Sequence, residues 1–406
     1  MRRTIYPALP MAVAALLSAA ALHAAESEEG GLDISLSDQF LYDDNLFRVP
    51  RSIQPVSLET GEPFERSDHV NRASLALDGR WRVSSQAFEA RLAATDHRYA
   101  ENDELDHVGG QARLLWDWQT AGDWSGRLGA DYSRELASFA NSRIFTRDLL
   151  DIVSYFGDLR YGIGARWAVR AGARRFDVSH SADLREFDDF VSDTFSAGIE
   201  YQTPATTLVA IDVRTTDGEF PRATFAGTLL PERDYTEDAA TLRVRHPFSD
   251  KTVFEGLVGY LRREHDNAAI DDYSGDIWRL SLNWRPGFKT QILFSGWREI
   301  KAYADVESDY FEATGVSVAP TWSMTDKLKL VLAASYEQQD YIGSNPSLPQ
   351  SFAREDTVEA AQVGLTWLPR EPLELGFSYR FEQRDSNRDD FAFDDNLGSV
   401  TVRFTF

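Results

Sequence analysis

Alternating apolar and polar residues, a regular succession of short turns and long loops, and tryptophans beside the short turns predict the fold class of this 406-residue chain. We expect an all-β protein, a transmembrane antiparallel up-and-down β-barrel of about 18 strands. The alternation is clear in KLKLVLAASYEQ, where Leu328, Leu330 and Leu332 share one face and Lys327 and Lys329 the other. A period of two residues is the signature of a β-strand.

Eight short turns alternate with nine long loops, and these seventeen connections join eighteen strands. Strict alternation places all short turns at one end of a barrel, which is expected to be periplasmic, with the N- and C-termini beside it. The short turns read RVSSQ, QTAGD, GIGAR, QTPAT, HPFSDK, WRPGFK, WSMTDK and WLPREP. The long loops run through residues 45–68, 101–106, 138–150, 180–189, 217–234, 266–272, 303–308, 341–355 and 385–391.

Seven tryptophans lie within a few residues of a short turn. Their amphipathic rings prefer the boundary between membrane and water, so they are expected to form a periplasmic aromatic girdle. The alternative, aromatic residues in the core of a soluble β-sandwich, does not explain why they gather at one end of successive hairpins. The seven are Trp81, Trp118, Trp124, Trp167, Trp284, Trp322 and Trp367.

The first 24 residues read as a secretory signal peptide, with the basic pair Arg2 and Arg3 ahead of an apolar run through residues 11–22. An N-terminal membrane anchor is disfavoured because this run is too short to span a bilayer. Residues 25–406 are expected to form one barrel domain. Since no later apolar segment has the length of a membrane helix, strands are expected to span the membrane, and a Gram-negative outer membrane is the expected location.

The chain must close into a barrel because every backbone polar group in hydrocarbon needs an internal partner. We therefore expect the last strand, ending on Phe406, to pair with the first, LDISLSDQFLYDD. Asp38 falls on the outward face of that first strand, which predicts a bulge or a shifted register there.

Charged residues of both signs occupy the face opposite to the apolar one, and they are expected to line a hydrated bore. On the lipid face each arginine near the midplane would cost about 2–4 kcal/mol. Such groups can bind sugar hydroxyls or carboxylates; the alternative is that they only hydrate the bore and pair with one another. The candidates are Arg91, Arg113, Arg127, Asp131, Asp212, Arg214, Arg243, Arg245, Arg279, Glu374 and Arg380, together with Asp158, Arg160, Arg170, Arg285 and Arg403.

Composition and motifs argue against several other functions. A net charge of −23 disfavours a nucleic-acid partner, and the absence of cysteine removes disulfides and thiolate metal sites. Acidic loops offer oxygen ligands to calcium, but no EF-hand spacing is present, so solvated loops with no metal and no cofactor are expected. His97 beside Asp96 is an enzymatic alternative, yet G-x-S-x-G and H-E-x-x-H are absent, and no catalytic residue is expected.

The stretch FLYDDNLFRVP, residues 40–50, resembles the opening motif of the EpsL-type outer-membrane barrels of exopolysaccharide biosynthesis loci, which are associated with exosortases. The similarity continues through HRY and WDWQ…G…SGRLG, most clearly over residues 38–216. It implies a conduit for a secreted polysaccharide, with export components as partners and no established catalytic residues. The terminal phenylalanine also resembles the signal that barrel assembly machinery recognises. A passive porin for small solutes is the alternative function, and the oligomeric state is left open.

Overall fold

The computed structural model describes residues 31–406 except 223, 226–227, 230–231, 268–269, 303–307 and 345–353. The predicted signal peptide lies outside the described residues. The first nine strands are β1 Gly31–Asp43, β2 Asp68–Val83, β3 Gln86–Tyr99, β4 His107–Gln119, β5 Trp124–Leu136, β6 Leu149–Ile163, β7 Trp167–His180, β8 Phe190–Gln202 and β9 Leu208–Glu219. The second nine are β12 Tyr235–Ser249, β13 Thr252–His265, β14 Tyr273–Trp284, β15 Thr290–Ala302, β16 Ser308–Thr325, β17 Leu328–Ser344, β18 Glu355–Arg370, β19 Leu373–Ser386 and β20 Phe393–Thr405.

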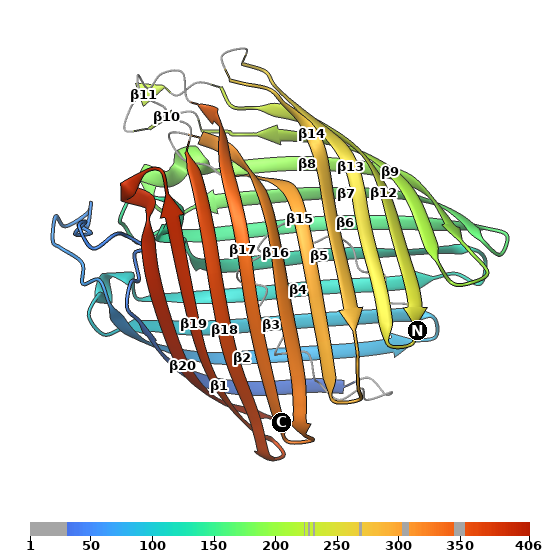
Figure 1. Cartoon of the computed structure of the whole chain (residues 1–406), viewed down its shortest axis with the longest axis horizontal. Helices are drawn as coiled ribbons and strands as arrows, with labels where there is room; N and C mark the ends of the chain where they lie inside the picture. The colour runs from blue at the N-terminus through green and yellow to red at the C-terminus, as the bar shows by residue number, and fades with distance from the viewer. Residues whose placement is uncertain are drawn as a thin grey trace.

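These strands form one 18-stranded antiparallel sheet that closes on itself, because β1 pairs with both β2 and β20. In Figure 1 the near wall, coloured yellow to red, crosses the far wall, coloured blue to green, as tilted barrel strands do. The predicted fold class is confirmed. In their described residues, the long connections hold a small hairpin and four short 3-10 helices: β10 Thr224–Phe225, β11 Thr228–Leu229, η2 Asp103–Leu105, η3 Phe139–Asn141, η4 Asp183–Asp188 and η5 Asp389–Phe391.

None of the helices in the described part of the chain has the length and apolar character of a transmembrane helix.

All eight predicted short turns join neighbouring strands at one end of the barrel, and the nine long connections lie at the other. The last strand, β20, ends at the short-turn end of the barrel, where Ile34 N donates to Phe406 O at 3.2 Å. Residue 31, where β1 begins, is at this end too. That this end faces the periplasm stays a prediction.

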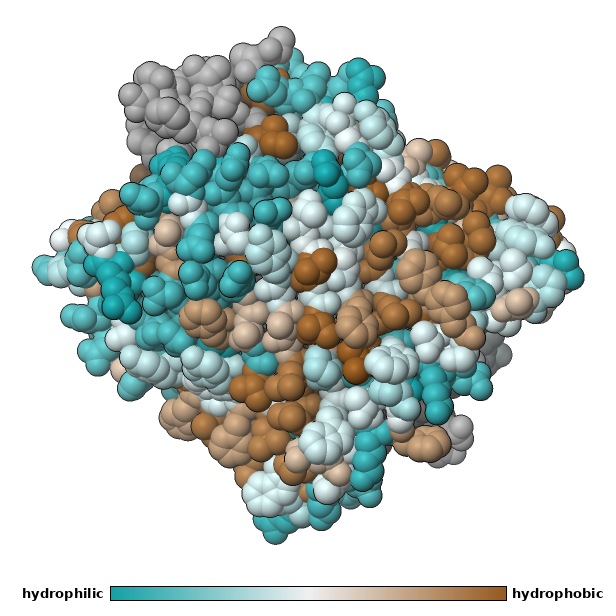
Figure 2. All heavy atoms as spheres, viewed as in Figure 1, coloured by the Kyte–Doolittle hydropathy of each residue, from teal (hydrophilic) through white to brown (hydrophobic). Residues whose placement is uncertain are grey.

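Large apolar side chains lie on the outside of the sheet. Phe195, Ile211 and Val316 are each more than half exposed, and each is followed along its strand by a polar residue, Ser196, Asp212 or Ser317, on the inward face. Figure 2 shows apolar side chains gathered in a band across the near wall, with polar ones beyond it toward the long-loop end. An apolar belt outside a closed sheet is the arrangement that a bilayer stabilises.

The expected bulge at Asp38 is wrong. The β1–β2 register runs without a shift from Gly31↔Arg80 to Asp43↔Asp68. Asp38 nevertheless points outward, and its carboxylate accepts a hydrogen bond from Asn71 Nδ2 at 2.8 Å. A cross-strand partner on the same face therefore satisfies the carboxylate without a break in the ladder.

Candidate functional site

The predicted bore residues alternate with the apolar belt along their strands and therefore lie on the inward face. Arg91 and Arg113 oppose one another on β3 and β4, whereas their neighbours Leu92 and Leu114 are about half exposed on the outside. The same parity holds for all eleven main candidates. Arg285 differs, because it lies in the turn after β14, where its backbone N–H donates to Lys251 O at 2.7 Å.

One row of charges crosses four consecutive strands. Asp78, Arg91, Arg113 and Asp131 are directly opposed from β2 to β5. Arg91 Nε lies 3.5 Å from Asp78 Oδ1, and Arg113 Nε lies 3.6 Å from Asp131 Oδ1. These side chains remain about 37–50% exposed, and such solvated ion pairs are weak, so their groups can exchange partners with a solute.

A denser network lies further round the inner wall. Asp212 on β9 binds Arg170 on β7 and, at 2.9 Å, Arg243 on β12. Gly198 lies on β8, between the strands that carry Arg170 and Asp212. A Cβ at this position would collide with the Asp212 carboxylate and lie 2.8 Å from Ile211 O. The missing side chain therefore makes room for the contact between Arg170 and Asp212.

Every one of the eleven candidates has an ion-pair partner, which is either another candidate or a neighbouring charged residue. The expectation that these charges pair with one another is therefore confirmed. Several partners were not singled out from the sequence, notably Glu237, Glu255 and Glu299, although their strand parity places them inward. The remaining pairs are Arg127–Asp158, Arg214–Glu237, Arg245–Glu255, Arg279–Glu299, Arg380–Glu382 and Glu374–Arg403. Contact between these residues and a solute stays a prediction.

The seven predicted girdle tryptophans lie on the outward face at the short-turn end. Six are about half exposed, while Trp118 is more covered and lies beside Trp116, with ring centroids 6.5 Å apart. Trp124 and Trp167 each contact a tyrosine on the neighbouring strand at 4.6 Å between ring centroids. Their position matches a girdle, and their contact with a membrane surface stays a prediction.

The opposite end of the bore, which we call the mouth, is covered by loops that fold inward. Phe47 and Phe64, in the 44–67 connection, are buried against inward-facing Leu41 and Val70 of β1 and β2. Phe139 of the 137–148 connection joins them, with its ring 4.7 Å from that of Phe47. Because these aromatic residues pack on the inner face of the wall, both connections lie within the mouth.

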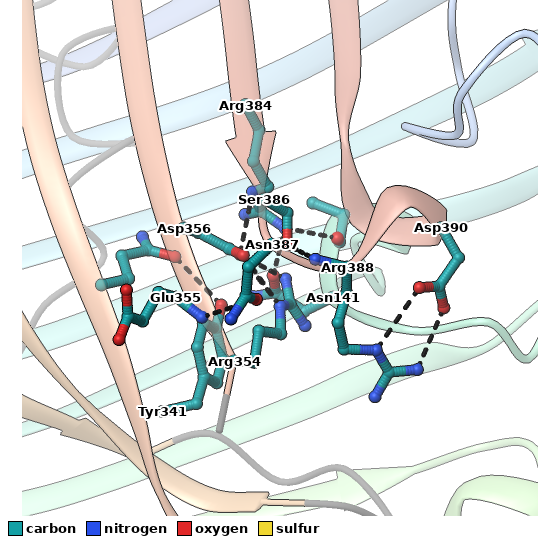
Figure 3. Close-up of polar contacts among 12 residues, drawn as sticks. Asn141, Tyr341, Arg354, Glu355, Asp356, Arg384, Ser386, Asn387, Arg388 and Asp390 are labelled. Atoms are coloured by element: carbon teal, nitrogen blue, oxygen red, sulfur yellow. Dashed lines mark hydrogen bonds and ion pairs between the residues drawn. The ribbon is translucent and has the colours of Figure 1, made fainter. Parts of the chain in front are cut away.

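A second set of contacts ties the 137–148 connection to the loop between β19 and β20. Arg143 Nε donates to Asp390 O at 3.0 Å. Arg384 on β19 donates to Asn141 Oδ1 at 2.8 Å and to Ala140 O at 2.7 Å. Figure 3 shows Arg384 and Asn141 reaching toward one another. We call the connections 44–67, 137–148 and 387–392 together the cap.

Arg354 anchors the far side of the cap. Its guanidinium lies 4.1 Å from the Tyr341 ring centroid and 3.6 Å from that of Phe391. Its Nε donates to both oxygens of buried Asp356 at 3.1 and 3.0 Å (Figure 3). A charged group held between two rings and a carboxylate is strongly oriented. Arg354, Asp356, Tyr341 and Phe391 therefore form an ordered cluster in this part of the mouth.

The stretch DDNL occurs twice, at residues 43–46 and 394–397, and the two copies meet where the barrel closes. Asn45 Nδ2 donates to Asp394 O at 2.8 Å and to Val49 O at 3.0 Å. Asn45 thereby turns the chain into the mouth. The motif that carries the family resemblance thus joins barrel closure to cap formation.

Arg48 neutralises two buried carboxylates beside this motif. It lies 3.1 Å from Asp43 Oδ2 and 3.0 Å from Asp395 Oδ2. Burial lowers the pKa of Arg48, but the nearby Asp43 and Asp395 carboxylates raise it by more. The pKa of Arg48 therefore lies above its ordinary value. Oxygens of Asp43, Asp44 and Asp395 lie within 4.8 Å of one another, a spacing that suits a metal ion, yet the Arg48 guanidinium already provides a cation to two of them.

The expectation of solvated acidic loops is wrong for several residues. Asp68, Asp148 and Asp188 are almost fully buried. Asp68 accepts hydrogen bonds from the backbone N–H groups of Ala100 and Asn102, at 2.9 and 3.0 Å. These carboxylates organise the loops, and the sequence alone does not show which backbone groups they will meet.

The histidines flanking the second long loop do not pair with the aspartates that precede them in the sequence, the arrangement that the enzymatic alternative would require. His97 and His107 stack with ring centroids 4.2 Å apart, and His107 is buried, with Nδ1 2.8 Å from Leu105 O. Asp96 and Asp106 instead bind Arg98, at 2.9 and 3.0 Å. Neither histidine is therefore oriented by its neighbouring carboxylate as a general base requires.

A closed barrel with an apolar belt, a charged inner wall and a capped mouth is the architecture of an outer-membrane β-barrel protein of the porin-like class. Comparison with known families supports the class. Residues 209–406 match the family model described as "Putative beta-barrel porin 2". The protein is located in the outer membrane.

A known structure shares the fold at low sequence identity. A BenF-like porin from Pseudomonas fluorescens Pf-5 superimposes with a TM-score of 0.50 and 11% identity, over 93% of this chain and 99% of that one. Pseudomonas aeruginosa OccK2 (OpdF), solved in complex with glucuronate, gives a TM-score of 0.49 and 10% identity over 93% and 99% of the two chains. At such identities the likeness concerns the fold alone.

Curated relatives match only part of the chain. Intimin from Escherichia coli O127:H6 is 29% identical over 160 residues, which cover 37% of this chain and 15% of intimin. The chain therefore spans only a small part of that relative's length.

Proposed function

We propose that this protein is a selective porin, a passive channel for small polar solutes. The observation that carries the proposal is the cap, in which Arg143 and Arg384 tie the 137–148 connection to β19 and the loop that follows it. Loops that contact one another within the mouth narrow it, and a narrowed bore favours small solutes over a wide, unselective flow.

The inner wall suits a channel that binds its solutes weakly. Arginines and carboxylates together offer hydrogen-bond donors and acceptors to hydroxyl, amide or carboxylate groups. Pairs such as Arg91–Asp78 and Arg113–Asp131 are half solvated, so a solute can replace one partner at small cost. Conduction requires this balance, because a solute must bind well enough to enter and weakly enough to leave.

Export of a polysaccharide, which the resemblance to EpsL-type barrels implies, is the alternative function. It requires that the cap move aside to admit a polymer chain. The family match over residues 209–406 favours a porin. The two functions share the barrel and the charged inner wall, and they differ in the size of what passes.

Reconstituted protein separates the two functions. A porin gives stable conductance in planar bilayers and lets liposomes swell in monosaccharides but not in larger oligosaccharides. Replacing Arg170 and Arg243 with methionine should lower the selectivity for anions over cations, with Arg262→Met, an exposed residue on the outward face of β13, as control. A silent channel, together with loss of surface polymer on deletion of the gene, would instead establish the export function.

A further inference from the structure

The wall of the barrel is incompletely paired between β14 and β15. Their ladder runs only from Trp278↔Arg298 to Trp284↔Ile292. Both strands continue beyond it toward the mouth, and the same register would oppose Ile277 to Glu299, Asp276 to Ile300, Gly275 to Lys301 and Ser274 to Ala302. None of these four pairs forms, although both segments are extended and paired on their other sides.

The outer end of β16 lies on the bore side of β13 and β14. Tyr310 has the outward parity of Val316, which is exposed, but Tyr310 is fully buried. Its ring stacks on His265 at 5.7 Å between centroids, and its hydroxyl donates to Asp271 O at 3.2 Å. His265 has the inward parity of β13, so an outward residue of one wall segment packs on the inner face of another.

An apolar core fills the overlap between these two layers. Tyr310 packs with Ala239, Leu261 and Tyr273, which are inward residues of β12, β13 and β14. The partly buried outward residues Ile300 of β15 and Ile342 of β17 complete it. The outer ends of β15, β16 and β17 therefore turn inward together, and we call them the inner flap.

Side chains bridge the gap that the backbone leaves. Glu312 on β16 accepts hydrogen bonds from Tyr273 Oη of β14 at 2.7 Å and from Arg298 of β15 at 3.0 Å. Arg298 Nε also lies 3.9 Å from Asp276 on β14. These contacts hold the flap in its inward position in place of the four missing ladder pairs.

We propose that the inner flap is a movable part of the wall that sets the width of the mouth. In the inward position described here, the flap occupies bore volume and leaves two strand edges unpaired. In the alternative position, the outer ends of β14 and β15 complete their ladder and the mouth widens. Each position is stabilised by a different set of contacts. Backbone hydrogen bonds between β14 and β15 favour the wide position, whereas burial of Tyr310 and its neighbours favours the inward position. The gating role rests on the proposed porin function.

Engineered cysteines test the movement, because the chain contains no native cysteine. Asp276→Cys with Ile300→Cys places two thiols on residues that oppose one another only when the ladder is complete. A disulfide forms only when the two Cα atoms come within about 7 Å. Leu280→Cys with Gly296→Cys, which oppose one another in the existing ladder, is the matched control.

We expect oxidation to join the thiols introduced at positions 276 and 300 more slowly than the control pair, and to raise the single-channel conductance until a reductant is added. Adding Tyr310→Ala, which removes the main contact of the inward position, should accelerate formation of the first disulfide and leave the control unchanged. A control pair that oxidises while the 276–300 pair does not overturns the movement. A disulfide without any change in conductance overturns the gating role.

A protein that conducts in no state contradicts the proposed porin function as well as the gating role. The disulfide yield still reports the movement of the flap in that case, because it is measured without conductance. The two failures are therefore distinguishable.

Discussion

Asp44 and Asn396 lie 352 positions apart in the chain and bind each other through three hydrogen bonds. Asp44 N donates to Asn396 O at 3.1 Å, while Asn396 donates through its backbone N at 2.7 Å and through Nδ2 at 2.8 Å to the Asp44 carboxylate. The β1–β20 ladder ends just before this contact. Closure of the barrel is therefore specified by side chains at the mouth as well as by the register of the strands.

Arg48 is predicted to be essential for the stability of this closure. Arg48→Met leaves Asp43 and Asp395 buried without a cation, which should lower the free energy of unfolding by about 3–5 kcal/mol. Urea unfolding in lipid vesicles, followed by tryptophan fluorescence, measures the change. Arg51→Met is the control: Arg51 is 85% exposed and lies 3.7 Å from Asp394. Equal effects of the two substitutions would contradict the role given to Arg48.

A charge introduced on the outward face of β16 should destabilise the barrel, whereas a charge on its inward face should not. Val316 is exposed on the apolar belt, and Ser317 faces the bore beside it. Val316→Arg should lower the free energy of unfolding by about 2–4 kcal/mol, since the guanidinium must enter hydrocarbon. Ser317→Arg should be nearly neutral in the same urea titration. The reverse order would show that the inward and outward faces have been exchanged.

Phe47 is predicted to hold the cap closed. It is fully buried against Phe64, Phe139 and Phe145. Phe47→Ala leaves a cavity that typically costs about 3–5 kcal/mol, so the cap should loosen, become sensitive to protease and give a higher single-channel conductance. Leu58→Ala, at an exposed position of the same connection, is the control. Unchanged conductance after cleavage of the cap would show that these loops do not narrow the bore.

Gly198 is predicted to be required for the charge network on the inner wall. The Cβ of Gly198→Ala would occupy the position of the Asp212 carboxylate. Displacing that carboxylate should cost about 1–3 kcal/mol and weaken its pairing with Arg170 and Arg243, with a change in ion selectivity. Gly398→Ala on β20, where a Cβ would meet nothing within 4 Å, is the control. A stable Gly198→Ala channel with unchanged selectivity would contradict this account.

Strand parity is the part of the site that the sequence predicts well. An alternation of two is fixed by the geometry of an extended chain, so Arg91 and Arg113 face inward and Leu92 and Leu114 outward in the structure as expected. Parity also places Asp38 outward correctly, but the expected bulge does not form there. Its partner Asn71 is on another strand, and only the register brings the two side chains together.

Periodicity and turn chemistry along the chain are enough to predict about eighteen strands, their two faces, and the separation of short turns from long loops. The positions of the long loops depend instead on contacts between distant parts of the fold. Phe47 enters the mouth because inward-facing Leu41 and Val70 offer it an apolar surface. Tyr310 is buried although its strand parity is outward, because the end of β16 lies on the inner face of β13 and β14. Such contacts join residues that are distant in the chain, and no local pattern encodes them.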